Sequence, residues 1–244
     1  ALFPLEAMGC TAENIVDDMS ISREDQDAFA FNSHQKALKA QADGAFDNEI
    51  IDISIPQRRR PPIVISKDEG PRAGTSIEKL ATLRAAFRSG GSVTAGNSST
   101  LNDGASAMII CTEEAALKYG LTPMAKILSS ASAGVNPETM GYGPVPATEK
   151  ALQKIGLSVD DLDLIELNEA FAAQSLGVIR RLGLDEAKVN VHGGAIALGH
   201  PLGCSGARIL TTLLHAMERY DKKRGLATLC VGVGQGLSLI VEKV

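Results

Sequence analysis

The chain has 244 residues and a formal net charge of −5; 44% of its residues are apolar, 4% are aromatic and none is tryptophan. This length allows one large domain or two modest ones, with a core built from aliphatic and small side chains. The negative charge argues against nucleic acid as the main partner. No apolar run is long enough to form a membrane span.

The cysteine pattern points to a reducing compartment. Cys10, Cys111, Cys204 and Cys230 have neither the C-x-x-C spacing of metal sites nor the arrangement of a secreted disulfide framework. The first ten residues lack the basic segment and cleavage pattern of a signal peptide. We therefore expect a cytoplasmic protein that holds no metal.

The N-terminal third begins with helical patterns. Residues 11–43 predict two helices, the first capped by Thr11 and the second by Ser22. Glu24 and Asp25 favour the positive end of the second helix, and Gly44 is expected to end it.

A strand and a third helix are expected next. Apolar and polar residues alternate over 49–56, which predicts a strand. The three arginines at 58–60 are interpreted as a solvated loop, with a patch for a phosphorylated cofactor or a partner subunit as the alternative. Residues 76–87 predict a short amphipathic helix.

Residues 92–107 are polar and small, in a pattern too specific for a linker. An apolar strand is predicted at 107–112 and a helix at 113–119. Gly120 and Pro123 then mark the expected domain boundary.

The remaining residues alternate strand and helix patterns. The predicted strands cover 125–133, 162–167, 226–231 and 237–241, the last two adjacent to each other. The predicted helices cover 146–155, a short segment opened by Ser158, residues 170–182 and the run after Ser205. This alternation predicts a layered α/β unit.

Residues 193–208 contain five glycines and one histidine, His200, which lies between Gly199 and Pro201. Proline fixes its own φ and biases the preceding residue away from helix, so His200 is expected in a rigid turn just before a buried helix. The simpler interpretation is a loop histidine packed against glycine.

Two further polar residues close apolar runs. Cys230 ends one and is followed by alternating glycines, and Asn168 ends another. Because strand ends in α/β layers converge on one crevice, Asn168, His200 and Cys230 are expected near each other. A Cys and a His beside glycine-rich turns suit an acid/base or nucleophile pair. The alternatives are a buried small cysteine, a helix N-cap for Asn168, and a Cys-His hydrolase triad.

Four motifs then carry a family resemblance. They are Thr-Ala-Gly-Asn-Ser-Ser at 94–99, Asn-Glu-Ala-Phe at 168–171, Gly-Gly-Ala-Ile-Ala-Leu-Gly-His-Pro at 193–201 and Cys-Val-Gly-Val-Gly-Gln-Gly at 230–236. Together they resemble the thiolases, which include acetyl-CoA acetyltransferases and 3-ketoacyl-CoA thiolases. The resemblance extends from about Met8 to the C-terminus.

The resemblance implies the thiolase fold, in which two related halves stack into five layers (α–β–α–β–α) beneath a loop domain. Residues 1–91 look like most of that loop domain. Residues 92–121 look like the end of the first half, and residues 122–244 look like the complete second half.

One feature of the family is missing. The family's nucleophilic cysteine belongs to the first half, and none of Cys10, Cys111 and Cys204 sits in a matching motif. We therefore expect a thiolase C-terminal portion whose N-terminal portion is absent or on another polypeptide, and which is inactive alone.

The resemblance also implies catalytic roles. His200 would take the proton of the missing nucleophile and donate a hydrogen bond to a thioester oxygen. Cys230 would act as acid and base, and Asn168 would hold a water that joins His200 in one oxyanion hole. The N–H of Gly232 would contribute to the other oxyanion hole. Glycine N–H groups and a nearby histidine are expected to lower the thiol pKa from about 8.5.

The substrates implied are acyl-CoA and CoA, with no permanently bound cofactor. The residues expected to contact CoA are Met8, Arg72, Ala95, Ser99, Ala170 and Phe171. An ordinary surface arginine is the alternative for Arg72. The Gly-Val-Gly-Gln-Gly and Gly-Pro-Val-Pro-Ala-Thr stretches look closest to degradative thiolases, including the 3-oxoadipyl-CoA type. The family implies fatty acid metabolism and a homodimer or homotetramer. A truncated chain that binds CoA or a subunit without turnover is the alternative function.

Overall fold

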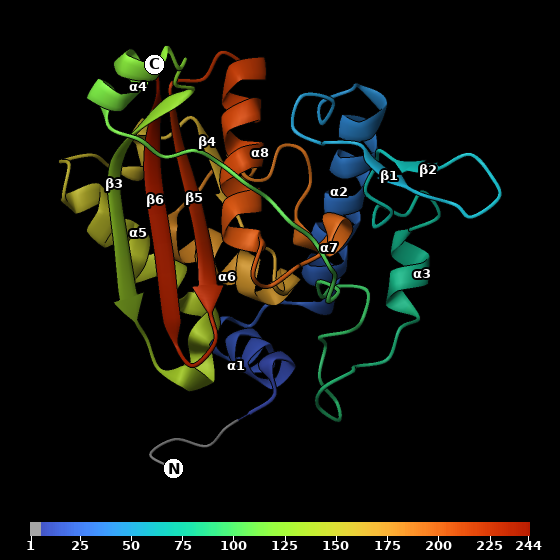
Figure 1. Ribbon diagram of the computed structural model, residues 1–244. Helices are drawn as coiled ribbons and strands as arrows, with labels where there is room; N and C mark the ends of the chain where they lie inside the picture. The colour runs from blue at the N-terminus through green and yellow to red at the C-terminus, as the bar shows by residue number, and fades with distance from the viewer. Residues whose placement is uncertain (1–5) are drawn as a thin grey trace.

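The computed structural model describes residues 6–244 and centres on a four-stranded sheet (Figure 1). The strand order is β3-β6-β5-β4. The strands are β3 (Ala125–Gly134), β4 (Leu164–Leu167), β5 (Arg224–Val231) and β6 (Gln235–Lys243). β4 and β5 run parallel, whereas β6 is antiparallel to both of its neighbours. The predicted strands of this sheet are thus confirmed.

Helices cover both faces of the sheet (Figure 1). α5 (Pro144–Gln153) and α6 (Ala172–Leu182) pack on one face, and α8 (Ser205–Arg219) packs on the other. Side chains alternate along each strand, so Ile165 contributes to the first core and Leu164 to the second. Leu213 of α8 is wholly buried in the second core. The α/β prediction is therefore confirmed.

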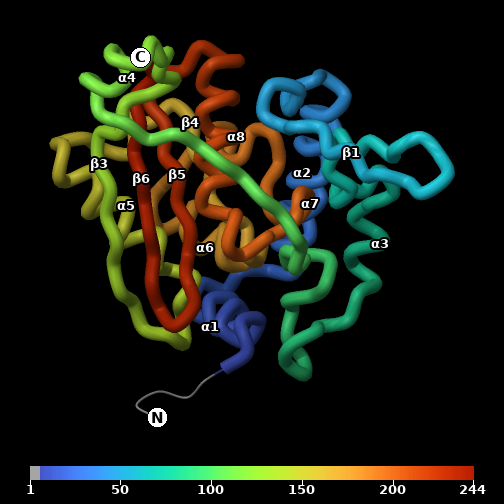
Figure 2. The backbone as a smooth tube through the Cα atoms, in the orientation of Figure 1, coloured from blue at the N-terminus to red at the C-terminus, as the bar shows by residue number. Residues whose placement is uncertain are grey.

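The N-terminal region lies beside this unit (Figure 2). It contains α1 (Met8–Met19), α2 (Arg23–Ala42), α3 (Ile77–Ala81) and a two-stranded hairpin of β1 (Ile53–Ile55) and β2 (Ile63–Ile65). α2 packs against α6 and against α7 (Ala195–Leu198). α1 packs against α6 and the 3-10 turn η1 (Pro137–Tyr142). The connections also contain α4 (Glu113–Tyr119), η2 (Val159–Asp161) and η3 (Glu186–Lys188). None of the helices in residues 6–244 has the length and apolar character needed to cross a membrane.

The two predicted N-caps have different outcomes. Ser22 caps α2 as predicted, because its hydroxyl accepts the N–H of Asp25 at 3.0 Å. Thr11 as a cap is wrong, since α1 already begins at Met8 with Ala7 at the N-cap position. The Thr11 hydroxyl instead donates to the carbonyl of Met8 at 2.7 Å, inside the helix. Threonine can make this bond to the preceding turn, so its presence did not mark a helix start.

The strand predicted at 107–112 is wrong. This segment is irregular, crosses in front of the sheet (Figure 1), and leaves Ile109 and Ile110 80% and 69% exposed. Met108 packs against the core under α8, and Ser106 Oγ lies 3.1 Å from Thr211 Oγ1. The described residues offer this segment no neighbouring strand, so its β-branched side chains have no ladder to join.

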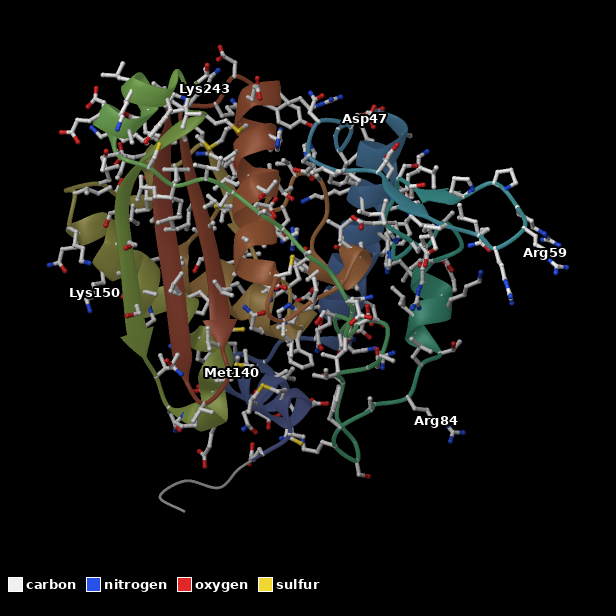
Figure 3. The ribbon with its side chains drawn as sticks, in the orientation of Figure 1. Asp47, Arg59, Arg84, Met140, Lys150 and Lys243 are labelled. Carbon is white, nitrogen blue, oxygen red and sulfur yellow. The ribbon has the colours of Figure 1, made fainter. Side chains whose placement is uncertain are left out.

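Two elements are shorter than predicted. The strand expected over 49–56 is a three-residue strand of an exposed hairpin. The arginines at 58–60 are exposed in the loop of this hairpin, as the solvated-loop interpretation requires, and Arg59 points away from the protein (Figure 3). The helix expected over 76–87 ends at Ala81, because the N–H of Ala86 pairs with the carbonyl of Val93 at 2.9 Å.

A cluster of three rings joins the N-terminal region to the end of α8. The His192 ring packs edge-on against Phe46 with centroids 5.7 Å apart, and its Nε2 lies 3.2 Å from the Tyr220 hydroxyl. Burial, with a smaller contribution from the Arg219 charge, lowers the pKa of His192 from 6.5 to about 4. The neutral imidazole is therefore the form that this packing favours.

The sign of the pH dependence follows from this shift. Because the unfolded chain protonates His192 near pH 6.5 and the folded chain only near pH 4, its stabilisation is complete above pH 6.5. It is lost progressively as the pH falls towards 4. We expect a His192→Gln variant to lose less stability than the original protein between pH 7.5 and pH 5, measured by urea unfolding. Parallel losses in the two proteins would contradict this assignment.

Candidate functional site

The parallel pair β4 and β5 brings two of the predicted residues to one edge of the sheet. The N–H of Asn168, directly after β4, donates to the carbonyl of Thr228 at 3.0 Å and so extends the ladder past Leu167. Cys230 lies further along β5 in the same direction, near its end. Asn168 is wholly buried, and Cys230 is 8% exposed.

His200 reaches this edge from the turn that follows α7. Gly199 adopts φ +99°, a conformation that side chains other than glycine rarely take. The N–H of His200 then donates to the carbonyl of Thr100 at 3.0 Å. The N–H of Gly199 donates to the carbonyl of Ala195 at 2.9 Å, so backbone hydrogen bonds hold both the histidine and the residue before it.

The His200 ring makes two close contacts. Its Nε2 lies 3.5 Å from Asn168 Nδ2, and its Nδ1 lies 2.6 Å from Ser205 Oγ at the start of α8. Burial, and then the nearby charge of Arg208, lower the pKa of His200 below its usual range. At neutral pH the ring is thus uncharged and can accept a proton.

Asn168 does not cap a helix. α6 begins at Ala172, and Phe171 occupies its N-cap position, so the N-cap alternative for Asn168 is wrong. Its Oδ1 atom is buried and has no hydrogen-bond partner among residues 6–244. A buried carbonyl oxygen is costly to leave unpaired, so this atom is suited to accept from a water or a ligand.

Cys230 lies in an apolar environment. Its neighbours in the buried cluster include Met140 of η1 (Figure 3) and the pair Ala170 and Phe171. Burial raises the pKa of the Cys230 thiol to about 12. The predicted lowering of this pKa is therefore wrong: the hydrogen bond from the backbone N–H of Cys230 itself does not offset desolvation, and no hydrogen bond joins Cys230 to His200 within the described chain.

The turn after Cys230 is compact. It runs through Gly232, Val233 and Gly234, and Val233 adopts φ +68° although it is β-branched. A Cβ placed on Gly232 would lie 4.0 Å from Met8 Sδ, which brings Met8 beside this turn. A Cβ on Gly236 would overlap the carbonyl of Gly143, so the glycine allows η1 and α5 to approach β6 closely.

The polar stretch at 94–102 connects the parts of the site. The N–H and the hydroxyl of Ser99 both lie 3.0 Å from the carbonyl of Ala170 and donate to it. Ser98 bridges to Phe171, and Leu101 bridges to His200. One segment therefore contacts both the Asn-Glu-Ala-Phe turn and the histidine turn.

A cavity of about 390 Å³ opens beside this segment. Arg72 and Ala95 line it, together with Lys79 and His34. Ser99 and Ala170 are hydrogen-bonded to each other next to it, while Met8 lies at the Gly232 turn. Phe171 is buried and packs edge-on against Phe87, with ring centroids 5.9 Å apart. The predicted contact residues are thus distributed from the cavity to the Cys230 turn.

Glu169 is a buried residue that the sequence interpretation overlooked. Its carboxylate accepts hydrogen bonds from Ser33 Oγ at 2.7 Å, Asn190 Nδ2 at 2.8 Å and the N–H of Ile196 at 3.1 Å. Burial raises its pKa, against the effect of these hydrogen bonds. The residue joins α2, the loop before α7 and α7 itself. The sequence feature that could have identified Glu169 is its position between two apolar runs, because a carboxylate buried there needs hydrogen-bond donors.

Glu166 was also overlooked. It faces α8 from β4, and its Oε2 lies 3.3 Å from Arg208 Nη1. Burial raises the pKa of Glu166 to about 8, although the Arg208 charge acts in the opposite direction. This contact between Glu166 and Arg208 connects β4, which leads to Asn168, with α8, which follows His200.

Comparisons with known proteins agree with this architecture. Residues 2–114 match the N-terminal domain of thiolase, and residues 121–243 match its C-terminal domain. An acetyl-CoA acetyltransferase of Pseudomonas aeruginosa is 57% identical over 97% of this chain and 60% of its own length. A beta-ketoadipyl-CoA thiolase of Acinetobacter baylyi is 50% identical over 100% of this chain and 61% of its own length.

Solved structures give the same result. An acetyl-CoA acetyltransferase of Bacillus anthracis superposes with a TM-score of 0.95 at 51% identity, covering 98% of this chain and 60% of that one. A human mitochondrial 3-ketoacyl-CoA thiolase in complex with CoA gives 0.93 at 44% identity, covering 97% and 59%. This chain therefore spans about 60% of the length of the relatives that it matches. With both thiolase domains matched in order and the fold shared, the chain belongs to the thiolase family.

Proposed function

We propose that this chain is the loop domain and C-terminal half of a thiolase that transfers acyl groups between CoA thioesters through an acyl-cysteine intermediate. The observation that carries the proposal is the placement of Asn168 and His200 in contact, at the sheet edge where Cys230 also ends its strand. The nucleophilic cysteine would come from the portion that this chain lacks.

His200 acts first in the proposed reaction. The uncharged imidazole accepts the nucleophile's thiol proton, and the thiolate attacks the 3-keto carbon of the substrate. The protonated ring then donates a hydrogen bond to the thioester oxygen, together with a water held by Asn168. The unpaired Asn168 Oδ1 supports this water site.

Cys230 supplies the second proton transfer. When the C2–C3 bond of a 3-ketoacyl-CoA breaks, the electron pair stays on C2 of the departing acetyl-CoA. A thiol of raised pKa is protonated at neutral pH, so it can give its proton to this carbon. The resulting thiolate then takes the proton of incoming CoA, which attacks the acyl-enzyme. The N–H of Gly232 stabilises the negative oxygen that forms on the acyl carbon in this step. When this tetrahedral state collapses, the bond between the acyl carbon and the nucleophile's sulfur breaks and acyl-CoA leaves. The nucleophile's thiolate then recovers its proton from His200.

The cavity beside residues 94–102 is the proposed CoA site. Arg72 and Lys79 supply positive charge for the nucleotide end, and Ala95 offers the close backbone approach of a small residue. Ser99, Ala170, Phe171 and Met8 would follow the pantetheine arm towards Cys230. The human mitochondrial thiolase that shares this fold was solved with CoA.

Several broader features belong to the proposal. The division at 1–91, 92–121 and 122–244 is part of the proposal, and its boundary near residue 121 is supported by the family match that begins there and by the start of the sheet at Ala125. All four cysteines are free, which supports a reducing cytoplasm. Exposed apolar side chains at Ile109, Ile110 and Leu117 support assembly with the missing portion and into a homodimer or homotetramer. A degradative role in fatty acid metabolism is also part of the proposal, and it is supported by the Gly-Val-Gly-Gln-Gly and Gly-Pro-Val-Pro-Ala-Thr stretches that look closest to degradative thiolases.

A second function is favoured by the missing nucleophile. None of Cys10, Cys111 and Cys204 lies in a motif of the family's nucleophile, so a chain that binds CoA or a subunit without turnover is the alternative. Intact-mass analysis of the native protein separates the two, because a mass well above 25.6 kDa would reveal the further portion.

Cys230→Ser in the complete enzyme should reduce thiolysis and condensation by at least about 10²-fold, because a hydroxyl is a far weaker acid than a thiol. Acyl-enzyme formation from an activated donor should persist in part, since the nucleophile lies elsewhere. Mass spectrometry of the acylated protein is the measurement. Labelled acetyl attached to Cys230 itself would show that the role is misassigned.

His200→Ala should slow acylation of the nucleophile by about 10²-fold or more, the usual range for loss of a general base. α8 should still form, since its buried face does not include the His200 ring, so circular dichroism should hardly change. Single-turnover acylation kinetics give the rate. Near-normal acylation would return His200 to a packing role.

Residues 1–244 expressed alone should neither cleave acetoacetyl-CoA nor become acylated at any cysteine. The chain should also fail to form a monodisperse monomer, because its exposed apolar segment rarely remains uncovered in isolated chains. CoA release, protein mass and light scattering after incubation with acetoacetyl-CoA test both expectations. A stable monomer with turnover would mean that no nucleophile is missing.

A further inference from the structure

We propose that Ser205 is a positioning residue that selects the tautomer of His200 and leaves its Nε2 atom bare to accept the nucleophile's proton. The tautomer is a property of the folded protein. Its use in proton transfer rests on the proposed function.

Ser205 is placed for this task by the start of α8. It is the first residue of that helix and is wholly buried. Its Oγ lies 2.6 Å from His200 Nδ1 and 3.0 Å from the carbonyl oxygen of Pro201. A hydroxyl has one proton to donate and lone pairs that accept. Ser205 can therefore bond to both neighbours only if it donates to one of them and accepts from the other.

The contact on the other side of the ring decides which role is which. Nε2 faces Asn168 Nδ2 at 3.5 Å, and an amide nitrogen only donates. A protonated Nε2 would place two donors face to face. With Nε2 bare, Nδ1 carries the ring proton and donates to Ser205 Oγ. The hydroxyl proton of Ser205 then goes to the Pro201 carbonyl, so one direction of donation satisfies all three contacts.

A neutral hydroxyl partner has a different effect from the carboxylate of a protease triad. A carboxylate would stabilise the imidazolium and raise the pKa of the histidine. At His200, burial and the Arg208 charge both lower the pKa, and Ser205 has no charge with which to oppose them. Ser205 therefore orients the ring and fixes its proton without converting it to the charged form, which could not act as a base.

The reverse arrangement is chemically possible and defines the test. Pro201's carbonyl also accepts the N–H groups of Cys204 and Ser205 in the first turn of α8. If this carbonyl did not take the hydroxyl proton, Ser205 could donate to Nδ1, and Nε2 would carry the ring proton. The Asn168 amide would then have to turn its unpaired Oδ1 towards the ring.

The experiment compares the complete enzyme with its Ser205→Ala variant after selective labelling of histidine with ¹⁵N. Nuclear magnetic resonance distinguishes a protonated from a bare ring nitrogen by its chemical shift. We expect a bare Nε2 and a protonated Nδ1 in the original protein at pH 7.5. In the variant, both His200 shifts should move towards intermediate values, because the ring exchanges between tautomers.

Kinetics provide the second readout. Ser205→Ala should lower kcat for thiolysis by about 10-fold to 100-fold, less than the roughly 10⁴-fold loss seen when a triad aspartate loses its tautomer control. The KM for CoA should stay within about twofold, since Ser205 does not line the cavity with Arg72 and Ala95.

Thr211→Ala is the matched control. Thr211 also donates its hydroxyl to the carbonyl four residues earlier on α8, at 3.0 Å from Ala207, but does not contact His200. Thr211→Ala should leave the His200 shifts and kcat unchanged. Circular dichroism gives the melting temperatures of both variants, so that a loss of stability can be separated from a loss of His200 positioning. A protonated Nε2 in the original protein would overturn the inference, as would unchanged shifts in Ser205→Ala. If the shifts change as expected but no form of the enzyme performs thiolysis, the tautomer assignment stands and the proposed function fails.

Discussion

The parallel pairing of β4 with β5 is the constraint on which the site depends. It is the one parallel pair of the four-stranded sheet within residues 6–244, and it makes both strands end at the same edge. The ladder continues through the N–H of Asn168 to Thr228, so Asn168 leaves the strand at a fixed height beside Cys230. An antiparallel neighbour would have sent its end to the opposite edge. The sheet thus brings together an amide and a thiol that are distant in sequence.

Buried carboxylates hold the irregular segments around this edge. Glu169 accepts three hydrogen bonds from α2, α7 and the loop before α7, and Glu13 of α1 accepts the N–H groups of Ser92 and Val93 at 2.9 Å each. Loops expose backbone N–H groups that no ladder satisfies, so a buried acceptor can fix them where secondary structure cannot. The turn that carries His200 is held by a backbone hydrogen bond instead, from the N–H of His200 to the carbonyl of Thr100. The site therefore rests on hydrogen bonds to loops as much as on the sheet.

Much of the fold followed from local signals. Apolar runs between helical patterns identified the four strands of the main sheet, and the serine cap before Glu24 identified the start of α2. The failures share a cause, which is that local patterns do not report partners. Residues 107–112 have strand composition but no adjacent strand among the described residues, and the helix from Ser76 is cut short by pairing between Ala86 and Val93. Thr11 fits both a cap and a helical interior, and only packing distinguishes them.

The sequence predicted that Asn168 and His200 would lie together, which the structure shows, but it did not predict the electrostatics around them. Glycines, a proline and strand ends were enough to single out Asn168, His200 and Cys230. The sequence could not show that Cys230 lies among Met140, Ala170 and Phe171, where desolvation outweighs the hydrogen bond from its own backbone N–H. Burial raises the thiol pKa and lowers the imidazole pKa, so both groups are neutral at pH 7. A neutral imidazole can accept a proton and a neutral thiol can donate one, so these two roles require no ion pair between His200 and Cys230. The apolar pocket that gives Cys230 this property is built partly by Ala12 and Val93 of the N-terminal region. The acid strength of Cys230 thus depends on how closely Ala12 and Val93 pack against it.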